Sequence, residues 1–175
     1  MSEISKMIII CGYPGVGKST IAQPLAKRLK YALLDIDDLK EMVDPSIVPD
    51  DDDRGRIAYS IFKNLVRKQV SLGNSVIIDV PFTYTWLRES MVLVAKEYNA
   101  RMIIVYCWCR DEITLKRIWE RFQSNPEKYG NRDETAFYRI KRNFVPIDAI
   151  VNLKVNTEDE PDRNVEKIEA YLNSG

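Results

Sequence analysis

The sequence predicts an α/β fold in which a five-stranded parallel sheet is covered by helices on both faces. Two observations lead to this fold class. Short apolar runs alternate along the chain with segments whose apolar residues recur at helical spacing. The apolar runs are nearly unbroken, which is typical of strands buried on both faces in a parallel sheet. At 175 residues the chain is long enough for one such domain.

Each expected element follows from its own pattern. Apolar runs indicate strands at 7–11, 31–35, 75–79, 101–107 and 149–155. Helical spacing and local stop signals indicate helices at 20–30, 38–43, 57–70, 83–98, 112–122, 134–143 and 162–173. We expect Asp38 to be the N-cap of the short second helix. Residues 44–53 hold two prolines and four consecutive aspartates, which predicts a solvated loop.

The first strand leads directly into the glycine-rich run Gly12–Ser19, which has the spacing G-x-x-x-x-G-K-S. A strand, a glycine-rich turn and a helix in this order let backbone amides curve around phosphate oxygens at a helix N-terminus. Lys18 is then placed to reach the β- and γ-phosphates of a nucleotide, and the Ser19 hydroxyl to hold Mg²⁺. The expected nucleotide contacts in and directly after this run are Gly12, Gly15, Val16, Gly17, Lys18, Ser19 and Thr20.

Composition excludes several other classes of protein. Basic and acidic residues balance at 26 each, so the basic footprint of duplex binding is absent and nucleic acid is an unlikely partner. The chain has no histidine, which removes Ser-His-Asp and Cys-His chemistry and most zinc sites. Its three cysteines lie in or beside apolar strands, and we interpret them as buried thiols. With no apolar run near the ~18 residues of a membrane span and no signal-peptide pattern, a cytoplasmic location is the expectation.

Carboxylates follow two of the predicted strands. Asp35 and Asp37 come after the second strand, and Asp79 ends the third. Ligands of open parallel sheets bind beyond the carboxyl ends of the strands, so we expect these side chains near the phosphates. Carboxylates there would repel a triphosphate unless they hold Mg²⁺ or accept a proton from an incoming hydroxyl. Which aspartate serves which purpose is open at this stage.

Two arginines offer positive charge on the other side of the expected site. Arg117 and Arg121 lie four residues apart on one helix face, just before a polar break at 124–133. Phosphoryl transfer spreads negative charge over the equatorial oxygens, and an arginine on a closing lid can neutralise it. We therefore expect both near the phosphates. The alternative is a solvated helix on which they pair with neighbouring acids.

On these residues the chain resembles the small P-loop kinases of the nucleoside- and shikimate-kinase type. The likeness rests on Gly12–Ser19, Asp35-Ile36-Asp37, Asp79 and Arg117-x-x-x-Arg121. It is nearest to small-molecule kinases resembling chloramphenicol phosphotransferase and polynucleotide kinase domains. The resemblance implies one P-loop kinase domain over residues 1–175 with a lid at about 122–135, a sheet order of 2-3-1-4-5, and Mg-ATP as the phosphoryl donor.

The resemblance also implies roles for single residues. The catalytic residues would be Lys18, Asp37 and Arg121, with Asp37 matching the base for the acceptor hydroxyl. Ser19, Asp35 and Asp79 would contact magnesium, while Asp35, Asp37, Asp79 and Arg88 would contact the substrate. Arg117, Asn156 and Thr157 would lie against the adenine. The pocket for the unknown acceptor would be built from Phe82, Tyr84, Trp86, Arg88 and the helix at 57–70.

The sequence favours one function and leaves two alternatives open. The favoured function is a kinase that moves the γ-phosphate of ATP to a hydroxyl of a small molecule. A nucleotide-binding regulator without transferase activity and a 5′-hydroxyl polynucleotide kinase are the alternatives. A hexameric motor ATPase is disfavoured, because Val80 follows Asp79 where such proteins place a glutamate. The acceptor, the choice of ATP or GTP and the oligomeric state are not determined by the sequence.

Overall fold

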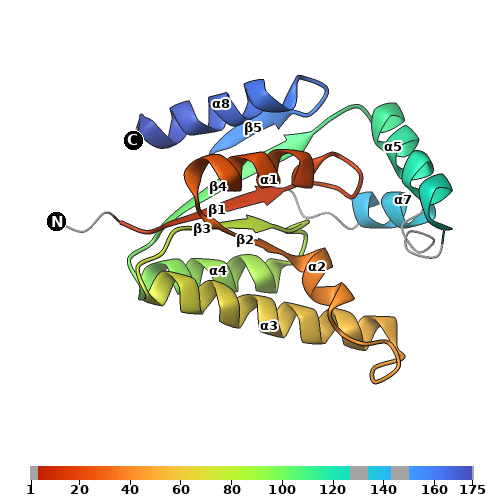
Figure 1. Cartoon of the computed structure of the whole chain (residues 1–175), viewed down its shortest axis with the longest axis horizontal. Helices are drawn as coiled ribbons and strands as arrows, with labels where there is room; N and C mark the ends of the chain where they lie inside the picture. The colour runs from red at the N-terminus through yellow and green to blue at the C-terminus, as the bar shows by residue number, and fades with distance from the viewer. Residues whose placement is uncertain (1–3, 127–133, 143–149, 175) are drawn as a thin grey trace.

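The computed structural model describes residues 4–126, 134–142 and 150–174. Within these residues a five-stranded parallel sheet runs in the order β2-β3-β1-β4-β5, so the predicted sheet and its order are confirmed (Figure 1). The strands are β1 (Lys6–Cys11), β2 (Ala32–Asp35), β3 (Val76–Asp79), β4 (Arg101–Trp108) and β5 (Leu153–Asn156).

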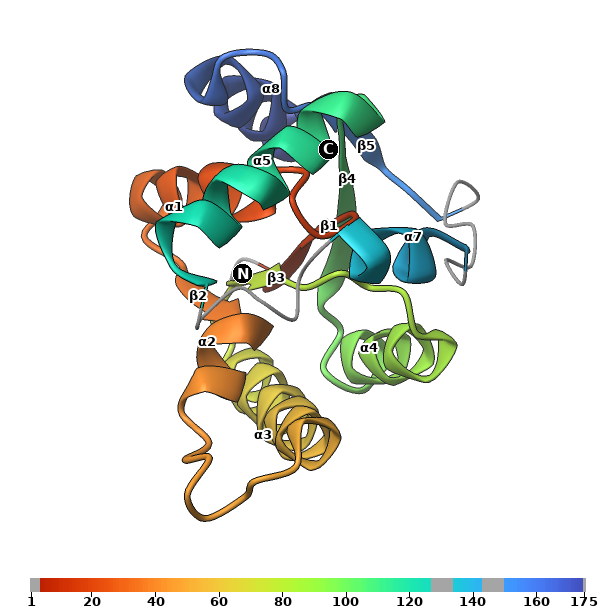
Figure 2. The ribbon, with the colours of Figure 1, turned by 90° about the vertical axis from the view of Figure 1, so that its right-hand side faces the viewer.

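Helices cover both faces of the sheet and its carboxyl edge. They are α1 (Lys18–Leu29), α2 (Ile36–Glu41), α3 (Asp51–Ser71), α4 (Thr85–Glu97), α5 (Asp111–Ser124), α7 (Glu134–Arg142) and α8 (Pro161–Asn173). Helices α1 and α8 lie on one face, and α3 and α4 lie on the other (Figure 1). Helices α2, α5 and α7 stand around the end to which the strands point (Figure 2). The carboxyl edge of the sheet is therefore surrounded by chain on several sides.

The central strand β1 shows why the sequence folds in two layers. Its side chains alternate between the faces, with Met7 and Ile9 in the core under α3 and α4. Ile8 and Ile10 belong to the other core, under α1 and α8. All four side chains are fully buried. Because both faces of the strand are covered, its sequence is an unbroken apolar run.

Acidic caps make helices α2 and α3 begin earlier than the apolar pattern predicts. Helix α3 begins at Asp51, within the expected loop, because the Asp50 side chain caps it by accepting the Asp53 amide at 2.9 Å. The consecutive aspartates form the first turn, where negative charge is favoured by the helix dipole. Helix α2 begins at Ile36 with Asp35 as its N-cap, so Asp38 is not the cap. In both cases an acidic cap, and not apolar spacing, sets the first residue.

Strand β5 is shorter than predicted, since it begins at Leu153 and not at 149. Just before it, Asn152 exchanges two hydrogen bonds with Ile104 of β4, one through its side-chain oxygen at 2.7 Å and one through its amide at 2.9 Å. The side chain thus replaces regular strand pairing. Of the expected lid at 122–135, residues 127–133 lie outside the described residues. Among the described helices, none is both long and apolar enough to span a membrane.

Candidate functional site

The glycine-rich run forms a tight loop between β1 and α1. Gly12 has a φ of 144°, and a Cβ placed there would lie 2.4 Å from the backbone oxygen of Cys107, so no larger residue fits. Gly17 is the N-cap of α1 with a φ of 96°, and no side chain caps this helix. The first amides of α1 therefore remain available to an anion at the positive end of the helix dipole. This geometry suits a bound phosphate, and residues 12–19 are here called the phosphate loop.

Lys18 and Ser19 connect the loop to the end of β3. The Lys18 ammonium donates to the Tyr13 carbonyl at 3.1 Å across the loop, and the Ser19 side chain hydrogen-bonds to the Asp79 carboxyl. Asp79 is buried, and its Oδ2 has no hydrogen-bond partner among the described residues. Burial raises the pKa of Asp79, while the Lys18 charge and the Ser19 hydrogen bond oppose the rise.

The arrangement at Asp79 fits a magnesium ion. Within the described part of the chain, no cluster of three or more histidine, cysteine or acidic residues could hold a metal alone. Mg²⁺ does not require one, because it is commonly bound by one or two protein oxygens together with phosphates and water. A buried carboxylate oxygen without a partner, next to a serine hydroxyl at the phosphate loop, provides that kind of donor set.

Asp35 lies beside Asp79 because the two residues are register partners on β2 and β3. Its half-buried side chain accepts the Asp37 amide at 2.8 Å and thereby caps α2. Burial, and next the charge of Asp79, raise the pKa of Asp35 to about 7, although the Asp37 amide works in the opposite direction. The cap turns the chain so that Asp37 stands exposed on α2 at the carboxyl edge of the sheet.

A cleft of about 290 Å³, here called the P-loop cleft, brings most of the predicted site together. Its walls include the predicted residues Gly15, Gly17, Lys18, Ser19, Asp35, Asp37, Asp79 and Arg121. They also include residues that sequence reasoning did not propose, among them Lys40, Asp51, Asp52, Phe137, Arg139 and Ile140. Phe137 of α7 is buried and meets Tyr13 of the phosphate loop edge-on at 6.0 Å, which holds α7 over the cleft.

A second cavity of about 500 Å³, here called the aromatic pocket, shares a wall with the P-loop cleft. The residues common to both are Ile36, Asp37, Lys40, Asp51, Asp52, Pro81 and Tyr84. The wall is continued by Gly55, Arg56, Tyr59 and Lys63 of α3 and by Trp86 of α4. Asp37 therefore stands at the junction of two cavities, one lined by the phosphate loop and the other by aromatic residues.

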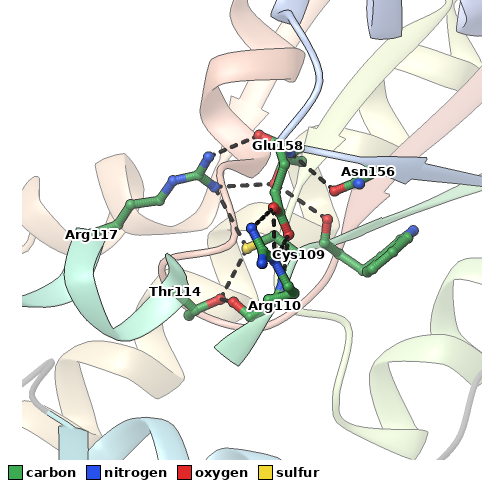
Figure 3. A network of polar contacts seen from close by, with 8 residues as sticks. Cys109, Arg110, Thr114, Arg117, Asn156 and Glu158 are labelled. Carbon is green, nitrogen blue, oxygen red and sulfur yellow. Dashed lines mark hydrogen bonds and ion pairs between the residues drawn. The ribbon is translucent and has the colours of Figure 1, made fainter. Parts of the chain in front are cut away.

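A third cavity of about 540 Å³, the Arg117 pocket, opens on the other side of the phosphate loop. It is lined by Gly17, Thr20, Arg117, Arg121 and Thr157, among others. Arg117 reaches from α5 toward the segment after β5 (Figure 3). Its guanidinium donates to the Val16 carbonyl at 3.0 Å, the Thr157 hydroxyl at 3.1 Å and the Thr157 carbonyl at 2.8 Å. The Thr157 hydroxyl also donates to the Val16 carbonyl, so three distant segments meet at the loop.

The chain also matches a known protein family. A protein family described as "AAA domain" matches residues 7–147. The chain belongs to this family.

Solved structures share the fold over almost the whole chain. A candidate kinase from Chloroflexus aurantiacus j-10-fl is 21% identical with a TM-score of 0.77, covering 100% of this chain and 99% of its own. A sugar kinase from Janibacter sp. HTCC2649 is 13% identical with a TM-score of 0.70, covering 98% and 95%. The APS kinase of Mycobacterium tuberculosis, in complex with AMPPNP and APS, is 14% identical with a TM-score of 0.69, covering 97% and 98%. The resemblance to small P-loop kinases is thus confirmed as a likeness of fold.

In this AAA domain protein, four predicted site residues are absent from the described walls of the three cavities: Gly12, Val16, Arg88 and Asn156. Arg88 is buried, and its Nε donates to the Phe82 carbonyl at 2.8 Å. Phe82 is itself buried with a left-handed φ of 61°, so Arg88 supports the turn after β3 and is absent from the described walls of the three cavities. The Asn156 side chain accepts the Glu158 amide at 3.1 Å, which shapes the turn that carries Thr157.

The residues that sequence reasoning missed in this AAA domain protein carry weak local signals. Lys40 lies three residues after Asp37 and hence on the same face of α2. Arg139 is exposed on the short amphipathic helix α7, a position that is equally compatible with a solvated surface. Only the packing of α7 against the phosphate loop brings Arg139 to the cleft. That packing depends on contacts far apart in sequence.

Proposed function

We propose that the protein is a Mg²⁺-dependent kinase that transfers the γ-phosphate of ATP to a hydroxyl group of a small molecule. One observation carries the proposal. The P-loop cleft unites Lys18 and Ser19 with Asp37, and Asp37 also lines the adjoining aromatic pocket. A phosphoryl donor and an acceptor can therefore meet at one carboxylate. Such an arrangement serves transfer between two bound molecules better than it serves nucleotide binding alone.

At the donor end, the phosphate loop and Lys18 would hold the β- and γ-phosphates. Ser19 and Asp79 would hold the magnesium ion, which neutralises charge on the phosphate oxygens when it is bound. Arg121 lines both the P-loop cleft and the Arg117 pocket, so its guanidinium is available to the charge that develops during transfer. The Arg117 pocket, which includes Thr157, would take the base of the nucleotide.

At the acceptor end, Asp37 would orient the hydroxyl and receive its proton. The other two strand-end carboxylates suit this role less well. Asp79 is buried beside Ser19, and one oxygen of Asp35 is occupied by the amide that it caps. Asp37 is exposed and faces both cavities. A kinase role is also supported by the shared fold of the three enzymes named above, one of which was solved with AMPPNP and APS.

The test is a transfer assay over a panel of small hydroxyl compounds, with phosphorylated products identified by mass spectrometry. We expect Mg-ATP to support product formation, and Lys18→Ala and Asp37→Asn each to reduce the rate by roughly 100-fold or more. Asp38→Asn is the matched control, since Asp38 is an exposed neighbour on α2 that lines none of the three cavities described above.

The proposal fails if no compound is phosphorylated and ATP hydrolysis is unchanged in Lys18→Ala and Asp37→Asn. Nucleotide-dependent stabilisation of the wild type without transfer to any compound would instead favour a nucleotide-binding regulator.

A further inference from the structure

The aromatic pocket contains a glycine that the packing of its helix does not require. Gly55 lies in the interior of α3 and lines this pocket. Glycine in a helix interior lowers stability relative to alanine, because the unfolded chain gains freedom and no side chain packs. A Cβ at Gly55 would meet no atom within 4 Å, so no neighbour excludes a larger residue. The missing side chain leaves room on the pocket wall for a bound molecule.

Three aromatic rings form one side of the same pocket. Tyr84 and Trp86 stack with ring centroids 5.6 Å apart at 18°. Tyr59 of α3 meets Trp86 at nearly a right angle, with centroids 5.3 Å apart. Trp86 is 44% exposed and Tyr84 is 50% exposed although both line a cavity. This apolar surface would be covered by a molecule with a ring or another flat apolar face.

The charged residues of the pocket are divided between its two ends. The end shared with the P-loop cleft holds Asp37, Lys40, Asp51 and Asp52, and there Lys40 is bound to Asp51 at 2.7 Å. The charged wall residues that belong to the aromatic pocket alone are Arg56 and Lys63, both cationic. The end away from the phosphates is therefore positive.

Neither cation at the far end is neutralised firmly. The Lys63 ammonium lies 5.6 Å from the centroid of the Trp86 ring, and no carboxylate among the described residues pairs with it. Arg56 contacts Asp53 at 3.2 Å, but these side chains are 81% and 56% exposed, so solvent screens the pair. A ligand anion could engage both cations without breaking a buried ion pair.

We infer that the acceptor is an organic anion: a hydroxyl-bearing molecule whose ring lies on Tyr84 and Trp86 and whose carboxylate or phosphate faces Lys63 and Arg56. Its hydroxyl then points to Asp37, at the opposite end of the pocket. This inference rests on the proposed function, because it describes the acceptor of that reaction. A cationic acceptor is disfavoured, since its charge would face Arg56 and Lys63.

Binding is tested without transfer by following Trp86 emission. The double substitution Trp108→Phe and Trp119→Phe removes the two other tryptophans, both of which are exposed. Two matched pairs of probes separate the possible anionic groups: cis-4-hydroxycyclohexanecarboxylate with its primary amide, and glucose 6-phosphate with glucose. We expect at least one anion to bind roughly tenfold or more tightly than its neutral partner.

Variants of α3 locate the binding in the pocket. Lys63→Ala should weaken the anion roughly tenfold and leave the neutral partner within about twofold, and Lys63→Arg should restore most of the affinity. Lys68→Ala, an exposed lysine on the same helix outside the pocket, should change neither. Gly55→Phe should abolish anion binding, while Gly55→Ala should preserve it.

The inference is overturned if neither anion changes Trp86 emission, if the neutral partners bind equally well, or if Lys63→Ala leaves anion affinity unchanged. These results are independent of transfer. Anion binding at Lys63 without a phosphorylated product would contradict the proposed function while leaving the pocket assignment intact. If only neutral compounds were phosphorylated, and Lys63→Ala did not change their rate, the proposed kinase function would stand. The inference that the acceptor is an anion would then be wrong.

Discussion

The two acidic residues at the ends of β2 and β3 show that the surroundings of a carboxylate determine what it can contact. Asp35 and Asp79 are register partners, yet they differ in what they contact. Asp79 is buried with an oxygen that no described group satisfies, and the Ser19 hydroxyl lies beside it. Asp35 is half-buried and serves as a helix cap. The same residue type thus provides an unsatisfied buried oxygen at one position and a structural hydrogen bond at the other.

Asp35 predicts a dependence of stability on pH. Burial and the charge of Asp79 raise its pKa to about 7 in the folded protein, above the ordinary value of about 4 for an unfolded chain. Between these values the folded state holds a proton that the unfolded state has lost, so rising pH lowers stability across this window. Asp35→Asn keeps the cap but carries no charge.

In magnesium-free buffer we expect Asp35→Asn to raise the free energy of unfolding at pH 8 by about 1–2 kcal/mol, a value reduced because solvent screens the half-exposed carboxyl. Near pH 4.5 the variant and the wild type should be almost equal. Urea denaturation at both pH values measures the difference. Glu89→Gln is the control, because Glu89 is an exposed carboxylate of α4 that is not among the charges raising the pKa of Asp35. An equal effect of Asp35→Asn at both pH values would contradict the assignment.

For single residues, the sequence predicted the members of the phosphate loop well and the residues around the aromatic pocket poorly. Lys18, Ser19 and the glycines follow from one local pattern, since spacing along eight residues fixes their relative positions. Arg88 does not, because its spacing fits a cavity wall and a buried support equally well. Its hydrogen bond to Phe82 becomes evident only when α4 is packed against the sheet.

At the scale of elements, α2 and α3 form the wall between the phosphate loop and the aromatic pocket. Both begin at acidic caps, and Lys40 of α2 is joined to Asp51 of α3 at 2.7 Å. Helix α3 carries Gly55, Tyr59 and Lys63 on its pocket face and Ala58, Phe62 and Val66 in the core. The position of its first turn therefore influences the shape of the aromatic pocket.

Removal of the α3 cap should measure this contribution. We expect Asp50→Ala to lower the free energy of unfolding by about 1 kcal/mol, because the Asp53 amide loses its acceptor. Asp52→Ala, in the same turn but not the capping residue, should cost less than half as much, since it removes only a favourable charge near the helix dipole. Thermal and urea denaturation measure both. Equal losses in the two variants would indicate that charge, and not the cap, starts the helix.

At the scale of the whole molecule, the phosphate loop is held by residues from distant parts of the chain. Arg117 of α5 and Thr157 after β5 both donate to the Val16 carbonyl, and Arg117 also binds Thr157. Arg110 at the start of α5 pairs with Glu158 at 2.7 Å, which joins the same two segments. The loop conformation is therefore coupled to the packing of α5 against the end of the sheet.

Arg117→Met should weaken nucleotide binding by roughly 5- to 30-fold, because the Val16 carbonyl and Thr157 lose a charged donor. Combined with Thr157→Val, the loss should be less than the sum of the single losses in free energy, since both side chains act on one carbonyl. Calorimetric titration with Mg-ATP measures the binding free energy of the wild type, the two single variants and the double variant. Lys116→Met is the control, because Lys116 makes only an exposed contact with Glu120 at 3.8 Å. Strict additivity would show that the two contacts act separately.

The sequence alone determined the α/β class, the strands and the phosphate loop, because unbroken apolar runs and the Gly12–Ser19 spacing are local patterns that physical chemistry constrains strongly. It also placed Asp35, Asp37 and Asp79 at one edge of the sheet, since parallel strands end together. Only the tertiary structure decided that Arg88 is a buried support for the turn after β3. It also decided that Lys40 and Arg139 reach the P-loop cleft, and that Arg56 and Lys63 line the aromatic pocket. These outcomes depend on how helices pack across the sheet, and a side chain on a helix can face core, cavity or solvent with the same spacing in sequence.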